Sequence, residues 1–372
     1  MRRDIIVKGL SEATYQKLLK KKESDGFEEK DWSDWMSHLV VGVNLVDSPS
    51  EMIQHTTRDS LLETWIQNLS KNLPKIWVSE SINALVPAEC TQAEKEGKDP
   101  DFPTGSAIVI GRGPSVFKNK HLELLANSDY RGTVVCTDGA LIDTLKAGVR
   151  PDLVENFLSV SVDGNRELIR KWYEHELVEK YGPHIKVALT SSVAPNVVQQ
   201  VEKVGAKTYF LLPLFDDWRQ IESYTKMHQF MTMSEKHPSG IPAMQAGGHA
   251  GATAWVLSWL VMRKSPVALI GLNLGYLPED PLESTYYWNG LMQKTGGNVA
   301  LVRSAFETIH NPDLNTDAVI DPVFRHYRES FRDMLSVTPK WVETINCTEG
   351  GSLFGEGIKS MPFKEWLGKY KK

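Results

Sequence analysis

The sequence predicts an α/β protein with a Rossmann-like, mainly parallel sheet, helices on both faces of that sheet, and a small helical region before it. Short apolar runs rich in β-branched residues recur after residue 106, helical segments separate most of them, and a glycine turn follows the first run. Such alternation is typical of parallel sheets, because each parallel strand needs a crossover connection.

We expect strands at 106–110, 133–137, 157–162, 185–190, 207–212, 267–271 and 341–345. Helices are expected at 166–180 and 194–204, in a segment that ends at Met262, and at 318–335, where His326 lies. Ligands of open parallel sheets bind beyond the carboxyl ends of the strands. The residues that follow each strand are therefore the candidates for a functional site.

The first part of the chain has a different pattern. Residues 15–22 read as a basic helix, and Leu61, Leu62, Trp65 and Leu69 recur at helical spacing. A polar stretch at 91–105 reads as a linker. We therefore expect a helical N-terminal region at 1–95 and a Rossmann-like domain at 96–372.

Composition limits the possible partners and location. The formal net charge of −5 argues against a nucleic acid as the main partner. The chain begins without the apolar core of a signal peptide, and charged residues and a proline interrupt its most apolar stretch, 252–274. The sequence thus predicts a cytoplasmic protein with no membrane span.

Cysteine usage gives no indication of a metal site. Cys90, Cys136 and Cys347 lie far apart and lack metal-ligand spacing. Cys136 falls inside an apolar run, so we expect a buried, inert thiol there.

The turn after the first strand is the most informative feature. Its residues are Gly111, Arg112, Gly113, Pro114 and Ser115. The glycines allow a sharp turn and a close approach to a ligand, and Ser115 can cap the next helix. Free N–H groups at such a helix start suit a nucleotide phosphate. The same turn also occurs in α/β proteins with no ligand there.

Polar and small residues also follow the other strands. These candidates are Asp138, Gly139, Asp163, Asn165, Ser191, Asn273 and Tyr276. Each one alone is explained as a turn former or helix cap, but together they indicate a pocket. Asp138 and Asp163 can hold Mg²⁺ against a phosphate chain, bind a ribose, or cap helices.

Three further segments have two interpretations each. Gly247, Gly248 and His249 precede a helix, where they can bind an anion or simply cap and pack. Glu349 and Gly350 follow the last expected strand and either line the pocket or fix a turn. The aromatic residues at 286–288 form either a lid over an acceptor or a packing cluster.

These motifs resemble those of one superfamily. The turn at 111–115 resembles the Gly-x-Gly-Pro-Ser loop of the motility accessory factors, which modify flagellin, and of bacterial sialyltransferases. Residues 247–252 and 266–276 resemble the second block of these proteins, and 345–355 resembles the Asn-x-Thr-Glu-Gly-Gly segment of the motility accessory factors. The similarity covers about 105–367. Residues 138–163 are also similar to archaeal 6-hydroxymethyl-dihydropterin pyrophosphokinase and to thiamine pyrophosphokinase.

The sequence departs from these patterns at two points. Asn273 stands where the superfamily usually has Asp, so a carboxylate is missing from that strand end. The pyrophosphokinase pattern continues into a further acid after Asp163, whereas Gly164 and Asn165 follow here.

The resemblance favours an enzyme, a glycosyltransferase that moves a CMP-activated acidic sugar to a hydroxyl of a small-molecule or protein acceptor. That reaction requires no cofactor, because CMP is a good leaving group and catalysis needs mainly orientation and charge stabilisation. The resemblance implies that the nucleotide lies over 111–115, with Gly247, Gly248 and Asn273 around it. His310 best matches the histidine base of the sialyltransferases.

Two alternatives stay open. One is a pyrophosphokinase that transfers diphosphate from ATP to 6-hydroxymethyl-dihydropterin or a similar alcohol, with Asp138 and Asp163 holding Mg²⁺. The other is a nucleotide-binding scaffold with no catalytic activity.

Overall fold

The computed structural model describes residues 20, 22, 49–97, 102–165, 169–216, 218–219 and 221–371. The chain divides into two compact units, Met1–His55 and Thr56–Lys372, and the second contains the sheet. Nearly all of the helix expected at 15–22 lies outside the described residues, as do residues 166–168 of the helix expected at 166–180.

The centre of the second unit is a parallel sheet of ten strands in the order β1–β6–β5–β4–β3–β2–β8–β11–β12, with β7 also paired to β6. The strands are β1 (Glu80–Ser81), β2 (Ala107–Ile110), β3 (Thr133–Thr137), β4 (Asn156–Ser161), β5 (Lys186–Thr190), β6 (Lys207–Pro213), β7 (Ala243–Met244), β8 (Val267–Ile270), β11 (Thr344–Asn346) and β12 (Ile358–Ser360). The predicted parallel α/β fold is confirmed, and all seven expected strands are present, with bounds shifted by up to three residues. The sequence analysis missed β1, β7 and β12, which have only two or three residues each.

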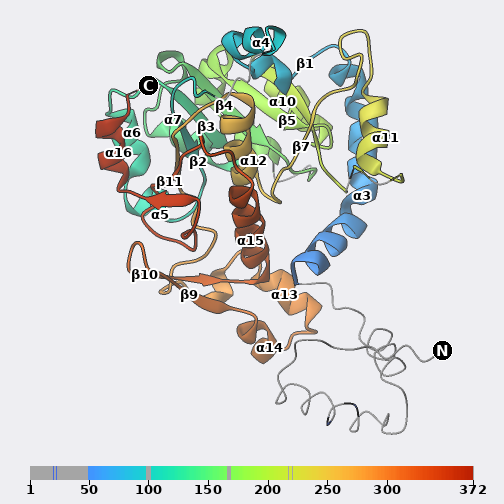
Figure 1. Ribbon diagram of the computed structural model, residues 1–372. Coiled ribbons are helices and arrows are strands. Elements are labelled where there is room, and N and C mark those ends of the chain that lie inside the picture. Colours follow the sequence, from blue (N-terminus) through green and yellow to red (C-terminus); the bar gives the residue numbers. More distant parts are fainter. Residues whose placement is uncertain are drawn as a thin grey trace, which may run out of the picture. The chain divides into compact units, whose positions relative to one another are not determined.

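Helices cover both faces of the sheet, as predicted (Figure 1). On one face Ile108 and Ile110 of β2 join a core with α5 (Ser115–Lys118), α6 (His121–Ala126), α7 (Asp138–Lys146), α9 (Glu176–Tyr181), α10 (Pro195–Lys203) and α16 (Phe363–Lys369). On the other face Ala107 and Val109 pack with α12 (Ala250–Val256) and α15 (Pro322–Ser336). Successive residues of a strand point to opposite faces, so an unbroken apolar strand supplies both cores.

The order of the strands reverses at the centre of the sheet. From β2 the chain builds outward through β3, β4, β5 and β6, and then returns to place β8 on the other side of β2. The loops that leave the carboxyl ends of β2 and β8 therefore lie at this reversal. Open α/β sheets bind ligands at this kind of reversal.

Helix α3 (Pro49–Ile76) belongs to the sheet's unit from Thr56 onward. Its Leu69, Leu73 and Ile76 are buried in the core, and β1 then pairs with β6. The compact unit thus begins at Thr56, whereas the sequence predicts a boundary near residue 95. The stretch expected as a linker begins inside helix α4 (Ala88–Lys95), where Cys90 is buried.

A small antiparallel pair, β9 (Glu307–Asn311) and β10 (Thr316–Ile320), precedes α15. The helix expected at 318–335 is therefore wrong at its start, since 318–320 are strand and α15 begins at Pro322. Val319 and Ile320 favour a strand, and Asp321 caps α15 by accepting bonds from the Val323 and Phe324 amides.

Candidate functional site

The carboxyl ends of β2 and β8 pack in direct backbone contact. A Cβ on Gly111 would lie 2.5 Å from the carbonyl oxygen of Gly271, and one on Gly113 would lie 2.2 Å from Oδ1 of Asn273. Neither position has room for a side chain. We predicted that these glycines allow a close approach to a ligand. In the structure, glycine is required because the loops after β2 and β8 approach each other closely.

The amide groups of Gly111, Gly113 and Ser115 in this turn have partners within the protein. Gly113 donates to the Gly271 carbonyl at 2.8 Å, and the Ser115 amide lies 3.4 Å from Oδ1 of Asn273. The Ser115 hydroxyl donates to the same oxygen at 2.9 Å. Ser115, expected as a helix cap, is instead the first residue of α5 and follows Pro114 at the cap position. The amide oxygen of Asn273 thus accepts from both the amide and the hydroxyl of Ser115.

Asn273 connects three strand ends. Its carbonyl accepts from the Ser352 amide at 2.8 Å, and a Cβ on Gly351 would lie 2.3 Å from that carbonyl oxygen. Gly350 lies beside its side-chain amide nitrogen, at 3.6 Å from an added Cβ. The loops after β2, β8 and β11 therefore meet at this buried residue.

Glu349 is turned toward the C-terminal helix. Its Oε1 accepts from the Phe363 amide at the start of α16, at 2.8 Å, and lies 3.3 Å from Nε2 of the buried His121. Of the two interpretations of Glu349, this contact matches the one that fixes a turn.

Asp138 starts α7 at the end of β3 and is buried. Its Oδ2 accepts from the Ser161 hydroxyl and its Oδ1 from the Gly139 amide, each at 2.7 Å. Burial, with a smaller contribution from the charge of Asp163, raises the pKa of Asp138 to about 6 even though both hydrogen bonds lower it. The two acids thus follow adjacent strands, Asp138 after β3 and Asp163 after β4.

The residues after β4 and β5 have contrasting surroundings. Asp163 is exposed, and its Oδ1 accepts from the Asn165 amide at 2.9 Å. Ser191 is buried, and its hydroxyl has no hydrogen-bond partner among the described residues. Asn68 and Asn72 of α3 donate to the backbone of these loops at 2.8–3.1 Å, with Asn68 bonding the Gly164 and Ser192 carbonyls.

Arg112 extends along α7. Its Nε donates to Asp143 at 2.9 Å, its guanidinium lies 4.8 Å from the Trp172 ring, and its Cδ would be 3.4 Å from a Cβ on Gly139. A half-exposed cation thus lies beside the residue that follows Asp138.

His249 caps α12 through Nδ1, which accepts from the Ala252 amide at 3.2 Å. Its Nε2 is buried and has no hydrogen-bond partner among the described residues. Burial, and to a lesser degree the nearby His326, lowers the pKa of His249 to about 3. The Gly247 and Gly248 backbones have positive φ, and Gly248 faces His326 and Tyr327 of α15.

Tyr276 lies close to the start of α15. Its hydroxyl donates to Asp321 at 2.7 Å, and its ring packs 5.0 Å from that of Phe324. Its hydroxyl thus fixes the helix that faces Gly248.

His310 lies apart from these groups. It is exposed on β9, where Nδ1 is 2.8 Å from Oδ1 of Asp317 on β10. Among the described contacts, none joins its side chain to the residues that follow β2, β3, β4 or β8.

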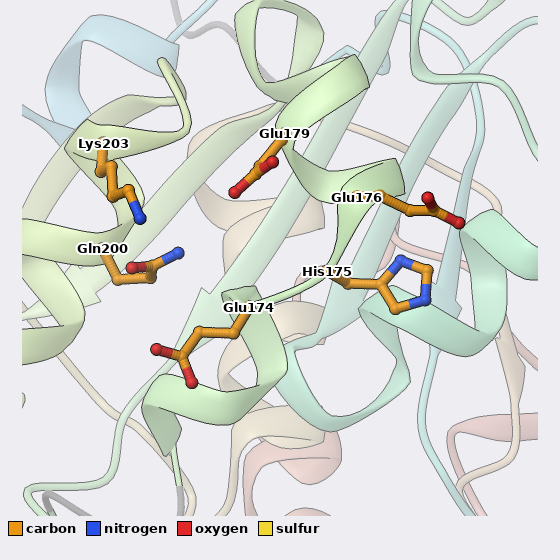
Figure 2. Close-up of a pocket in the computed structure, with 6 residues that line it drawn as sticks. All are labelled: Glu174, His175, Glu176, Glu179, Gln200 and Lys203. Carbon is orange, nitrogen blue, oxygen red and sulfur yellow. The ribbon is translucent and has the colours of Figure 1, made fainter.

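Figure 2 shows a surface hollow between α9 and α10. Its lining residues are Glu174, His175, Glu176, Glu179, Gln200 and Lys203. No predicted site residue lines it, and His175 Nδ1 is already engaged by the Leu177 amide. We therefore place the candidate site at the strand ends.

The sequence analysis missed several supporting residues. Ser159 and Ser161 both contact the hydroxyl of the buried Tyr173, at 3.1 and 2.9 Å, and Ser161 also orients Asp138. Two serines at alternate positions of an otherwise apolar strand were the available signal. No signal in the sequence indicated Asn68, Asn72 or Tyr327, because their partners lie far away in the sequence.

The donor set fits a magnesium ion bound together with phosphates. Among the described residues, no group of three or more His, Cys, Asp or Glu side chains could hold a metal by itself. Mg²⁺, however, usually takes one or two carboxylates plus water and substrate phosphates. Asp138 and Asp163 are such a pair, and each retains acceptor capacity beyond its hydrogen bonds.

Fold and site together define a doubly wound α/β protein with acidic, small and aromatic side chains at the carboxyl edge of its sheet. The sequence model of the family described as 6-hydroxymethylpterin diphosphokinase MptE-like matches residues 67–279, more than half of the chain. The chain belongs to this MptE-like family, which confirms the resemblance to the pterin pyrophosphokinase superfamily. His310, Glu349 and Gly350 lie outside the matched region.

The structure of the MAf glycosyltransferase from Magnetospirillum magneticum AMB-1 aligns with a TM-score of 0.48 at 13% identity. The alignment covers 71% of this chain and 34% of that protein, so the chain spans about a third of its length. No curated protein matches the chain. In the part of the chain that the structure describes, none of the helices is both long and apolar enough to cross a membrane.

Proposed function

We propose that this chain is a nucleotide-dependent transferase that moves a diphosphoryl group from ATP to an alcohol of the pterin type. The observation that carries the proposal is the pairing of Asp138 and Asp163 at the ends of adjacent strands. Two carboxylates at neighbouring strand ends, on the edge where a parallel sheet binds ligands, suit a divalent cation that is also bound by phosphates. The name of the family supports the same reaction class.

Asp138 and Asp163 would hold the magnesium ion, which when bound neutralises phosphate charge. Ser161 and the Gly139 amide keep the Asp138 carboxylate in one orientation, and the Asn165 amide does the same for Asp163. Arg112, half-exposed beside Gly139, supplies a cation for a phosphate oxygen.

Transfer of a CMP-activated acidic sugar is the second candidate. The absence of a carboxylate at Asn273 is compatible with it, because this reaction needs no metal there. His310 would be its base, although its contact with Asp317 leaves it outside the cluster of strand-end residues.

Thermal-shift assays with CMP, ATP and Mg²⁺ distinguish these functions. Stabilisation by ATP that requires Mg²⁺ supports diphosphoryl transfer, and stabilisation by CMP without metal supports the glycosyltransferase. If neither ligand stabilises the chain, both proposals fail.

A further inference from the structure

Two tyrosine hydroxyls meet beyond the end of the family match. Tyr287, at the start of α13 (Trp288–Lys294), lies with its hydroxyl oxygen 3.3 Å from that of Tyr327 on α15. Both tyrosines are only partly buried. Neither residue belongs to the site expected from the strand ends.

Tyr327 connects this pair to the candidate site. Two of its ring carbons would lie 3.1 Å from a Cβ on Gly248, and its ring centroid is 5.0 Å from that of His249. Burial, and to a lesser extent the charge of Asp163, raises the pKa of Tyr327. The Tyr327 ring therefore lies against the two residues that precede α12.

The pair is supported by a contact between the loop after β8 and the residue that caps α15. Asp321 accepts from Tyr276 at 2.7 Å and caps α15 through the Val323 and Phe324 amides at 2.8 Å. The Phe324 ring then packs 5.9 Å from Tyr287 and 6.2 Å from Tyr327. Both phenols are thus supported by an anchored helix.

The surroundings of the pair are neutral to acidic. Burial raises the pKa of both phenols, so both are uncharged at neutral pH. Two cations of α15 have other partners, since Arg325 pairs with Glu307 and Arg328 donates to the Ser352 carbonyl. With Asp163 and Asp321 nearby, an anionic group would be repelled here.

We propose that Tyr287 and Tyr327 form the acceptor subsite, which selects an uncharged, hydroxyl-bearing heterocycle over an anionic one. The phenols would exchange their mutual hydrogen bond for bonds to ring heteroatoms or to the acceptor hydroxyl, and Phe324 would pack beside the ring. This inference rests on the proposed function, because it assumes that the donor binds at Asp138 and Asp163.

Binding of 6-hydroxymethylpterin, followed by its intrinsic fluorescence, tests the subsite directly. We expect Tyr327→Phe and Tyr287→Phe each to weaken pterin binding by about 3–10-fold, because each variant loses one hydrogen bond to the ligand. The affinity for magnesium-ATP should be unchanged in both variants. The control variant Tyr181→Phe, on α9, should bind the pterin as tightly as wild type. Pterin-6-carboxylate should bind at least 10-fold more weakly than the alcohol, and Asp163→Asn should reduce that difference.

Unchanged pterin affinity in both tyrosine variants, with a lower thermal midpoint, would mean that the pair only stabilises the fold, and the inference would be wrong. Equal binding of the alcohol and the carboxylate would also overturn it. If wild type binds no magnesium-ATP, the proposed function fails and the subsite falls with it. If the donor binds and the pterin does not, only the acceptor assignment fails.

Discussion

The amide oxygen of Asn273 lies 2.9 Å from the hydroxyl oxygen of Ser115, and this hydrogen bond joins the loops that leave β2 and β8. It crosses the point where the strand order reverses. Because Gly113 and Gly351 also approach Asn273 too closely for a Cβ, the junction is both polar and tightly packed.

Gly113→Ala should therefore destabilise the fold by about 2–4 kcal/mol, because its Cβ would overlap Asn273 and the Gly271 carbonyl. Urea unfolding measures the loss. Gly290→Ala in α13 is the matched control, since nothing lies within 4 Å of its Cβ and alanine favours a helix. Equal stabilities for the two variants would show that the junction can move apart.

Asp138→Asn should lose magnesium-dependent ATP binding and gain stability at pH 8. The pKa of Asp138 is about 6 in the folded state against an ordinary value of 3.8, so ionisation opposes folding as pH rises through 6. This difference in pKa corresponds to a destabilisation of the wild-type fold by up to about 3 kcal/mol. The destabilisation is present at pH 8, where Asp138 is ionised, and absent below pH 4.

Urea unfolding at both pH values checks this prediction. Asp163→Asn, at an exposed position, should lose the same binding with little change in stability. The burial argument would be contradicted if Asp138→Asn were destabilised relative to wild type, and if that destabilisation were larger at pH 8 than at pH 4.

His249 has the opposite dependence on pH. Its pKa is about 3 in the folded state because it is buried, so below pH 6.5 the unfolded chain takes up a proton that the folded chain does not. Stability should fall by roughly 1.4 kcal/mol for each pH unit below 6.5. His249→Asn keeps a capping side chain and should make the stability between pH 7 and 5 less dependent on pH, as measured by urea unfolding. An unchanged slope would show that His249 does not control it.

The start of the compact unit can be tested by truncation. A chain that begins at residue 96 should fail to unfold cooperatively, because it lacks Leu69, Leu73 and Ile76 of the core and the bonds of Asn68 and Asn72. A chain that begins at residue 56 should unfold in a single transition by circular dichroism. Cooperative unfolding of the shorter chain would support the boundary near residue 95.

His310→Ala separates the two proposed reactions. His310 is exposed and paired with Asp317, so diphosphoryl transfer and stability should both be unchanged in the variant. The measurement is AMP release from ATP in the presence of 6-hydroxymethylpterin. A loss of turnover with intact donor affinity would instead assign His310 a catalytic role.

The sequence predicted the parallel sheet well, because strands buried on both faces are unbroken apolar runs such as 107–110. It also located Asp138 and Asp163, since strand ends of a parallel sheet share one edge. The occupant of the glycine turn could not be predicted, because the contact of Asn273 with Ser115 joins residues far apart in the sequence. For the same reason the pair of Tyr287 and Tyr327 became visible only in the folded chain.

The central claim is that Asp138 and Asp163 hold the phosphates of a nucleotide through magnesium. Isothermal titration of ATP into the wild-type chain, with and without Mg²⁺, tests it most directly, with Asp163→Asn as the matched variant. We predict binding that requires Mg²⁺ and is lost in the variant. Binding of equal strength without the metal, or retained in Asp163→Asn, would contradict the claim.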